Sequence, residues 1–134
     1  MEENMFNLER FVTAQNNYDS YNTALKEIKD GRKMSHWIWF IFPQQKGLGR
    51  SYNSEYYGLD GTDEARAYLA HPVLGARLRE ISEALLAHAG KRSIQAIMGS
   101  SIDVLKLKTS MSLFNRVSPN DIFQRVLDAF FDNQ

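Results

Sequence analysis

The 134-residue chain contains no cysteine, only three prolines and only three histidines. Without cysteine there can be no disulfide framework, no thiol nucleophile and no thiolate metal site. The histidines are His36, His71 and His88, and no two of them have the i, i+4 spacing that places two metal ligands on one helix. We therefore predict a protein that works without a metal ion and without a cofactor.

An excess of one charge is also missing, because 16 basic residues balance 16 acidic ones. No overall field would attract nucleic acid or an anionic membrane surface. The longest run of large apolar residues covers six positions, far fewer than the ~20 that cross a bilayer, and residues 1–4 do not form an apolar signal segment. We expect a soluble, cytoplasmic protein with no nucleic-acid or membrane partner, and the sequence leaves its oligomeric state open.

Strand patterns are absent as well, since no segment alternates convincingly between apolar and polar residues. Apolar residues recur instead at the i, i+3, i+4 spacing of helices. We therefore predict an all-α fold: one compact domain, residues 1–134, of about seven short and unequal helices interrupted by one long loop. The helices are expected within residues 6–14, 20–30, 37–42, 62–70, 72–89, 102–117 and 122–131, with a single helical turn over 94–98.

Several residues mark the expected helix ends. Thr62 is expected to cap the helix over 62–70, with Glu64 in its first turn facing the positive end of the dipole. His71-Pro72 then ends that helix and starts the next, with the proline in the first turn and His71 as a simple cap. Ser93 is expected to cap the short turn that follows.

The helix over 72–89 is the longest one expected, and its spacing predicts one clear inward face. Arg79 and Glu83 lie four residues apart on it and are expected to pair on the surface. On the helix over 102–117, Lys106 and Ser110 are neighbours at the same spacing. They could form a lysine-activated serine, but a polar helix face exposed to solvent is the simpler interpretation. The expected inward residues of 72–89 are Leu74, Leu78, Ile81 and Leu85, with Val73 as a further candidate.

Large apolar and aromatic residues are concentrated in Gly31–Gln45. Six of them, Trp37–Phe42, follow a basic and polar stretch. Burial of each such side chain is worth roughly 1.5–3 kcal/mol, so the run belongs in the core, as a short helix stopped by Pro43. On a helix Trp37 and Trp39 point about 200° apart. Either both are core, which is the plainer interpretation, or one is core and the other walls a pocket.

The stretch that follows, residues 44–62, is the one long irregular segment. Its first part, Gln44–Ser51, offers side-chain donors, two glycines that free the backbone and the two cations Lys46 and Arg50. This combination can hold a phosphate or carboxylate, although the spacing is not that of a Walker motif. A plain surface loop that needs glycine for its turns explains the same residues equally well.

The string from Gly31 to Gln44, followed by Gly47-Leu48-Gly49 and Ser51, resembles the family catalogued as domain of unknown function 1810, some members of which carry the misleading label calpastatin. Further matching stretches are Glu64–Leu69, His71–Leu78 and Lys106–Phe114, so the resemblance spans nearly the whole chain. It implies an all-helical single domain and supplies no established activity. Where the family has a Pro-Asp-Asp-type turn after Gly99, this chain has Ser100-Ser101-Ile102-Asp103, which leaves Asp103 as the only acidic group there.

The leading functional hypothesis is a polar and aromatic pocket at the ends of Trp37–Phe42 that binds an anionic or nucleotide-like small molecule. Hydrolysis or group transfer is the expected chemistry, with His36 as the candidate catalytic base because imidazole titrates near neutral pH. The alternative is a non-enzymatic protein-interaction module in which the tryptophan-rich segment is purely core. The candidate ligand-binding residues are Trp39, Gln44, Lys46, Gly49, Arg50 and Ser51.

Overall fold

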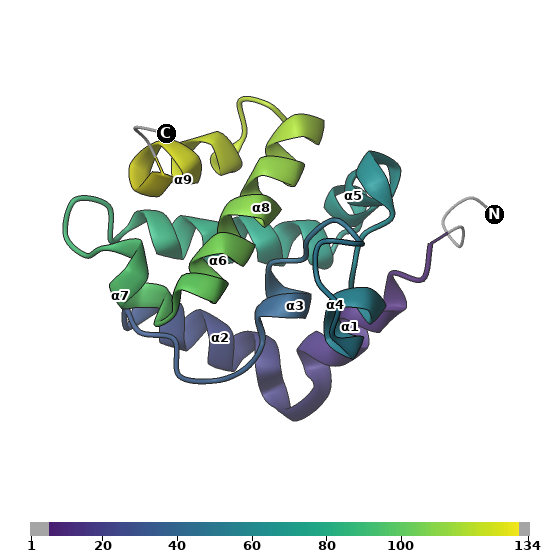
Figure 1. The fold of residues 1–134 in the computed structure, drawn as a ribbon, viewed down its shortest axis with the longest axis horizontal. Coiled ribbons are helices and arrows are strands. Elements are labelled where there is room, and N and C mark those ends of the chain that lie inside the picture. Colours follow the sequence, from purple (N-terminus) through teal and green to yellow (C-terminus); the bar gives the residue numbers. More distant parts are fainter. Residues whose placement is uncertain (1–5, 132–134) are drawn as a thin grey trace.

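A computed structural model describes residues 6–131, and every regular element in that range is helical (Figure 1). The all-α prediction is therefore confirmed; within the described range the one strand-like feature is an isolated bridge between Gln45 and Leu59. The acidic start at residues 1–4 lies outside the described residues. The elements are α1 (Glu9–Asn16), the 3₁₀ turn η2 (Asn17–Asp19), α2 (Ser20–Lys29), α3 (Ile38–Ile41), α4 (Tyr52–Tyr56), α5 (Gly61–Ala70), α6 (Leu74–Leu86), α7 (Ile94–Met98), α8 (Ser101–Val117) and α9 (Ile122–Phe131).

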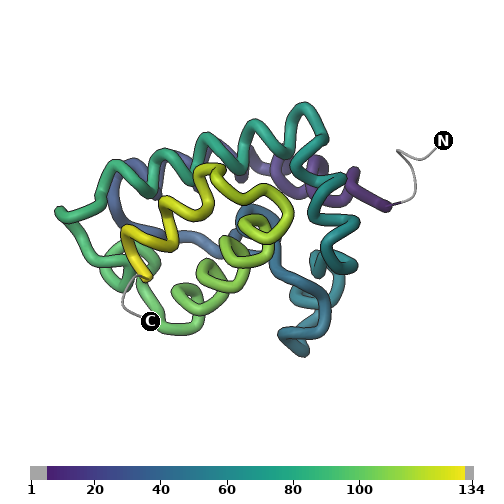
Figure 2. Tube along the Cα trace, turned by 90° about the horizontal axis from the view of Figure 1, so that it is seen from above, coloured from purple at the N-terminus to yellow at the C-terminus, as the bar shows by residue number. Residues whose placement is uncertain are grey.

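The two longest helices, α6 and α8, organise the others. Helix α6 packs against α2, α5 and α9, while α8 packs against α3, α5, α7 and α9. Figure 2 shows α6 as a long rod along one side of the molecule, with α9 and α8 beside it. The irregular chain that carries α4 lies at the end of the molecule away from the C-terminal part of α9 (Figures 1 and 2).

The core is one cluster to which almost every helix contributes a stripe. The expected inward residues of α6, namely Leu74, Leu78, Ile81 and Leu85, are all buried, whereas Val73, the further candidate, is exposed just before the helix begins. Helix α3 and the residues beside it contribute to this cluster, as the apolar run predicts, although Trp39 and Phe40 are only half-buried. Its buried residues, with those that flank it, are Trp37, Ile38, Ile41 and Phe42.

The first residues of α5 and α6 differ from the prediction, and the side chains that bind the backbone there come from positions a few residues away. Helix α5 begins at Gly61, so Thr62 is not its cap, and the backbone N–H of Asp60 donates instead to Glu64 Oε1 at 2.7 Å. Helix α6 begins at Leu74 rather than at the proline. The Nδ1 of His71 accepts from the N–H groups of residues 73 and 74, which confirms His71 as a cap.

Two further contacts were predicted from local spacing, and one of them is formed. Ser93 caps α7 as predicted, its hydroxyl accepting from the N–H of Ala96 at 3.0 Å. The expected surface pair of Arg79 with Glu83 is not formed. Arg79 binds Asp121 instead, with Nη2 3.0 Å from Oδ2, because the turn before α9 brings that carboxylate against α6.

Candidate functional site

The turn before α3 is fixed by a carboxylate that the apolar pattern did not single out, that of Glu27 near the end of α2. It accepts from the backbone N–H of Met34 at 2.8 Å and of Ser35 at 3.0 Å, from the Ser35 hydroxyl at 2.6 Å and from the indole N–H of Trp37 at 2.9 Å. Partial burial alone would raise the pKa of Glu27, but these hydrogen bonds outweigh it and hold that pKa below its ordinary value.

Lys33 fixes the same turn from the other side. Its ammonium lies 2.9 Å from Asp103 Oδ2, donates to the carbonyl of Ser35 at 2.6 Å and sits 4.8 Å from the ring centre of Trp37. The side chains of Lys33 and Asp103 are only 6% and 17% exposed, so this ion pair is part of the structure and not a surface contact. The single acidic group of the turn after Gly99 is thus used to hold residues 33–37.

The turn held in this way presents the His36 side chain to solvent. His36 is exposed, and no hydrogen bond or ion pair of its ring is found within the described residues. The imidazole precedes α3 by two positions, at the edge of the core, which is where the sequence placed it. It is accessible for binding, but the contacts found assign it no partner that would orient it as a catalytic base.

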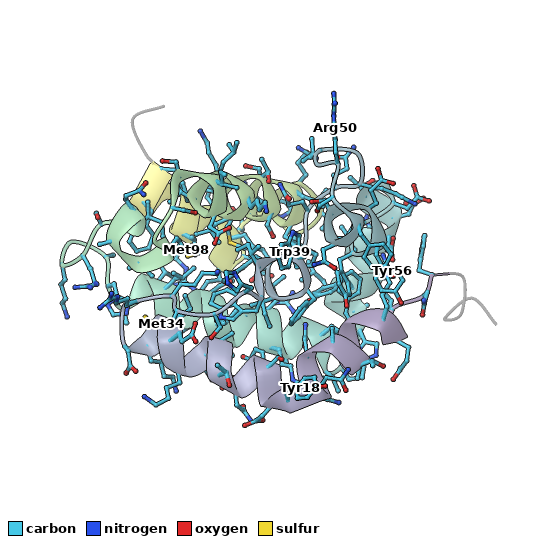
Figure 3. All side chains as sticks on the ribbon, turned by 60° about the horizontal axis from the view of Figure 1, so that its bottom comes forward. Tyr18, Met34, Trp39, Arg50, Tyr56 and Met98 are labelled. Carbon is cyan, nitrogen blue, oxygen red and sulfur yellow. The ribbon has the colours of Figure 1, made fainter. Side chains whose placement is uncertain are left out.

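The two tryptophans have different surroundings. Trp37 is 2% exposed with its indole N–H bound to Glu27, whereas Trp39 is half-buried at the margin of the core. The Nε1 of Trp39 is inaccessible to solvent and has no acceptor among the described residues. The ammonium of Lys106 on α8 lies 5.1 Å from the centre of the Trp39 ring. A cation and an unpaired indole donor therefore meet at one side chain, near the centre of the view in Figure 3.

The chain between Lys33 and Gln45 lies along one side of α8. Gln44, a predicted ligand, donates from Nε2 to the hydroxyl of Thr109 at 2.5 Å, and Thr109 itself donates to the carbonyl of Lys106. The interpretation of this side of α8 as solvated is wrong for Ser110, which is fully buried and whose hydroxyl has no hydrogen-bond partner in the described part of the chain. The pairs along the helix are Lys33 with Asp103, Trp39 with Lys106, Gln44 with Thr109, and Gln45 with Arg116 at 3.4 Å.

The loop residues Gly49, Arg50 and Ser51 lie apart from Trp39. The hydroxyl of Ser51 caps α4 by accepting from the N–H of Ser54 at 3.1 Å. A Cβ on Gly49 would lie 2.5 Å from the Ser54 hydroxyl, so this glycine is required by close packing. Arg50 extends into solvent (Figure 3). These three residues therefore serve the loop or face solvent.

Lys46 has a different position. Its backbone N–H donates to the carbonyl of Leu59 at 2.8 Å, and Leu59 in turn donates to the carbonyl of Gln44 at 2.8 Å. These bonds form the isolated bridge that closes the base of the loop. The side chain of Lys46 borders a cleft of about 340 Å³ between α1, α4 and the start of α5. Of the predicted ligand-binding residues, it is the one found on the border of this cleft.

A buried ion pair lies at that cleft and was also missed by the sequence analysis. The guanidinium of Arg10 on α1 lies 2.8 Å from Glu64 Oε2, and the two side chains are 8% and 4% exposed. Arg10 also donates to the carbonyls of Asn7, Tyr56 and Gly58. Glu64, expected to serve only the α5 dipole, thus joins three segments through Arg10. Positions 10 and 64 are too far apart in sequence for periodicity to connect them.

Two wider properties bear on the kind of site. Within residues 6–131 no helix is long and apolar enough to cross a membrane. The same residues contain no group of three or more histidine, aspartate or glutamate side chains placed to hold a metal ion.

Residues 5–134 match the family described as "Protein of unknown function (DUF1810)". The chain belongs to this family. The chain is similar to the conserved hypothetical protein Rv1873 from Mycobacterium tuberculosis, whose crystal structure was determined at 1.38 Å. The two are 41% identical, the match covers 96% of this chain and 92% of that one, and the TM-score is 0.88. No curated protein matches the chain. DUF1810 membership therefore accounts for the fold and assigns no activity.

Proposed function

We propose that this DUF1810 protein binds a small anionic ligand beside Trp39, on the face that α3 shares with α8. The observation that supports this most is the unpaired, buried Nε1 of Trp39 beneath the ammonium of Lys106. A buried donor left without an acceptor costs about 1–3 kcal/mol. An anion would supply the missing acceptor and at the same time neutralise Lys106.

Access to the indole N–H requires a neighbouring side chain to move, and Lys106 has the flexible stem to do so. Within the described residues Lys106 has no ion pair, and its ammonium contacts only the Trp39 ring. Its motion would therefore break no strong bond. Gln44 and Thr109, already bound to each other, border the same face with further amide and hydroxyl groups.

Nucleotides, sugar phosphates and dicarboxylates are the anions to examine first, because they combine charge with groups that can pack on an indole ring. If the bound ligand is hydrolysed or transferred, His36 is the adjacent side chain with a suitable proton affinity. The proposal itself concerns binding. The proposed location is the cytoplasm, where such ligands are abundant.

The alternative is a protein-interaction module. It is favoured by the burial of most of the tryptophan-rich segment, since Trp37, Ile38 and Ile41 are each 2% exposed. Exposed apolar side chains also lie near the face formed by α3 and α8, on the turn before α3 and at the start of α8. These are Met34, Ile102 and Leu105.

The test uses the indole N–H signals in an NMR spectrum of ¹⁵N-labelled protein, because the chain has only two tryptophans. Titration with ATP, ADP-ribose, glucose 6-phosphate, malate or inorganic phosphate should shift the Trp39 signal and leave the Trp37 signal in place. Binding at a hundredfold excess over Kd should also stabilise the protein by about 2.7 kcal/mol in a thermal denaturation assay.

The matched variants are Lys106→Gln, at the site, and Lys29→Gln, an exposed lysine at the end of α2. The first should weaken binding of the active compound and the second should not. A panel that moves neither indole signal, or an active compound indifferent to Lys106→Gln, would favour the interaction module.

A further inference from the structure

A second site is suggested by the 340 Å³ cleft, which shares no residue with the face around Trp39. The cleft lies between α1, the chain around α4 and the start of α5, near Tyr56 in Figure 3. A smaller hollow of about 230 Å³ adjoins it through Asn7, Arg10 and Tyr56. The first volume is at the lower end of the range for small-molecule sites, about 300–1,000 Å³. The bordering residues that matter are Phe6, Arg10, Lys46, Glu55, Tyr56 and Asp60.

Arg10 gives the cleft a fixed polar base. A guanidinium has five N–H donors. The Nε of Arg10 donates to Tyr56, Nη1 donates to Asn7 and Glu64, and Nη2 donates once to Gly58. One N–H of Nη2 is therefore left without an acceptor among the described residues. Because four bonds hold the group, it offers that donor at a fixed place.

The rim of the cleft carries charges of both signs. The side chains of Lys46, Glu55 and Asp60 border it, and none of them forms a hydrogen bond or ion pair within residues 6–131. Arg10 and Glu64 neutralise each other. The cleft thus has one unpaired ammonium beside the spare donor of Arg10, and two unpaired carboxylates.

We propose that this cleft binds a small zwitterion with one ammonium and one carboxylate group, a free α-amino acid being the simplest example. A simple anion would be attracted by Lys46 but repelled by the carboxylates of Glu55 and Asp60. A simple cation would be attracted by the two carboxylates but repelled by Lys46. A zwitterion satisfies both signs: its carboxylate pairs with Lys46 and the spare N–H of Arg10, and its ammonium pairs with Glu55 and Asp60.

The apolar part of the ligand has a surface to pack on. The ring of Tyr56 is 41% exposed and is held by Tyr52, stacked at 5.5 Å, and by Tyr57, edge-on at 4.8 Å. Phe6 borders the same cleft. Aromatic surfaces of this kind bind apolar side chains and the ammonium end of a ligand alike. An amino acid with a large apolar or aromatic side chain should therefore bind more tightly than glycine.

The experiment is a titration of the full chain by NMR, following the backbone amide signals of Tyr56 and Gly58, first with mixtures of the common amino acids at millimolar concentration. The best compound is then compared with its methyl ester, which lacks the carboxylate, and with its N-acetyl derivative, which lacks the ammonium. We expect each derivative to bind about tenfold more weakly, the loss of one ion pair of about 1.4 kcal/mol.

Two variants assign the contacts. Lys46→Gln should weaken the free amino acid and leave the ester unaffected, while Asp60→Asn should weaken the free amino acid and leave the N-acetyl derivative unaffected. Lys29→Gln, at the far end of α2, serves as the control for a general change of charge. The proposal is overturned if no amino acid moves the Tyr56 and Gly58 signals, or if ester or N-acetyl derivative binds as well as the parent compound.

Discussion

Trp37 and Trp39 are separated by one residue, and each has a lysine over its ring, yet only one of the two indoles has a hydrogen-bond partner among residues 6–131. The ring of Trp37 faces Glu27 and is 2% exposed, while that of Trp39 faces α8 and is half-buried. Lys33 lies 4.8 Å from the first ring and Lys106 lies 5.1 Å from the second. The local motif, an indole beneath an ammonium, is the same in both places.

The difference lies in what surrounds each pair. Lys33 is also held by Asp103 and by the carbonyl of Ser35, so both charged groups that contact the Trp37 indole, Glu27 and Lys33, have further partners. Lys106 has no comparable carboxylate, and the Nε1 of Trp39 has no acceptor in the described residues. Trp37 is therefore part of the structural core. Trp39 has a buried N–H donor without an acceptor in residues 6–131, which is uncommon in a folded protein and calls for an explanation.

The largest expected difference between the two is in stability. Trp37→Ala should lower the free energy of unfolding by about 3–5 kcal/mol, because it removes a buried ring and leaves Glu27 short of a donor. Trp39→Ala should cost clearly less, since part of its ring is already in solvent. Urea denaturation of the two variants measures both values. Equal losses would mean that Trp39 is as much a core residue as Trp37.

The sequence predicted the parts of the fold that depend on local periodicity. The stripe of α6, the burial of most of Trp37–Phe42 and the caps at His71 and Ser93 all follow from spacing and residue type within one segment. These features need no knowledge of what the segment packs against.

Several contacts that the sequence did not predict join distant segments. Arg10 and Glu64 are 54 positions apart, and Arg79 and Asp121 are 42 apart. The role of Glu27 was missed for the same reason, because its carboxylate is used by a turn that folds back over α2. Spacing along one helix shows only that such residues are off the apolar stripe.

The residues of the candidate site were also found or missed according to whether local sequence marks them. Trp39 and Gln44 were found because one lies in an obvious apolar run and the other just after it, and both contact α8. Lys106 was assigned to a solvated face because nothing in its own helix shows that residues 33–45 lie against it. Ser51 looked like a ligand because a helix cap and an anion-binding hydroxyl are the same residue type.

The hydrogen bonds around Trp37 depend on the carboxylate of Glu27. Glu27→Gln should lower the free energy of unfolding at neutral pH by about 1–3 kcal/mol, since the amide nitrogen cannot accept the bonds that one carboxylate oxygen accepted. Because the pKa of Glu27 is lowered in the folded state, its contribution is fully present above the ordinary value near ~4.3 and is lost as the pH falls through the lower folded-state pKa.

The variant should therefore lose less stability than the parent protein on acidification below about pH 5. Some dependence should remain from Asp121: burial alone would raise the pKa of Asp121, but hydrogen bonds from Arg79, Ile122 and Ser118 outweigh it and lower that pKa. Denaturation curves at a series of pH values measure both slopes. An unchanged acid slope in Glu27→Gln would show that the Glu27 contacts do not favour its charged form.

The smallest expected effect belongs to Trp39→Phe, and it separates the two tryptophans most sharply. Phenylalanine keeps most of the apolar surface and removes only the Nε1–H, which is unpaired at position 39 and bound to Glu27 at position 37. Removing an unpaired buried donor relieves its desolvation cost, whereas removing a bound one forfeits a charge-assisted bond. Trp39→Phe should therefore change the free energy of unfolding by less than about 1 kcal/mol, with an increase in stability allowed, while Trp37→Phe should lower it by about 1–3 kcal/mol. Urea denaturation of the pair measures the difference. If Trp39→Phe is as damaging as Trp37→Phe, the indole N–H of Trp39 already has a partner in solution, and the main argument for an anion beside it is lost.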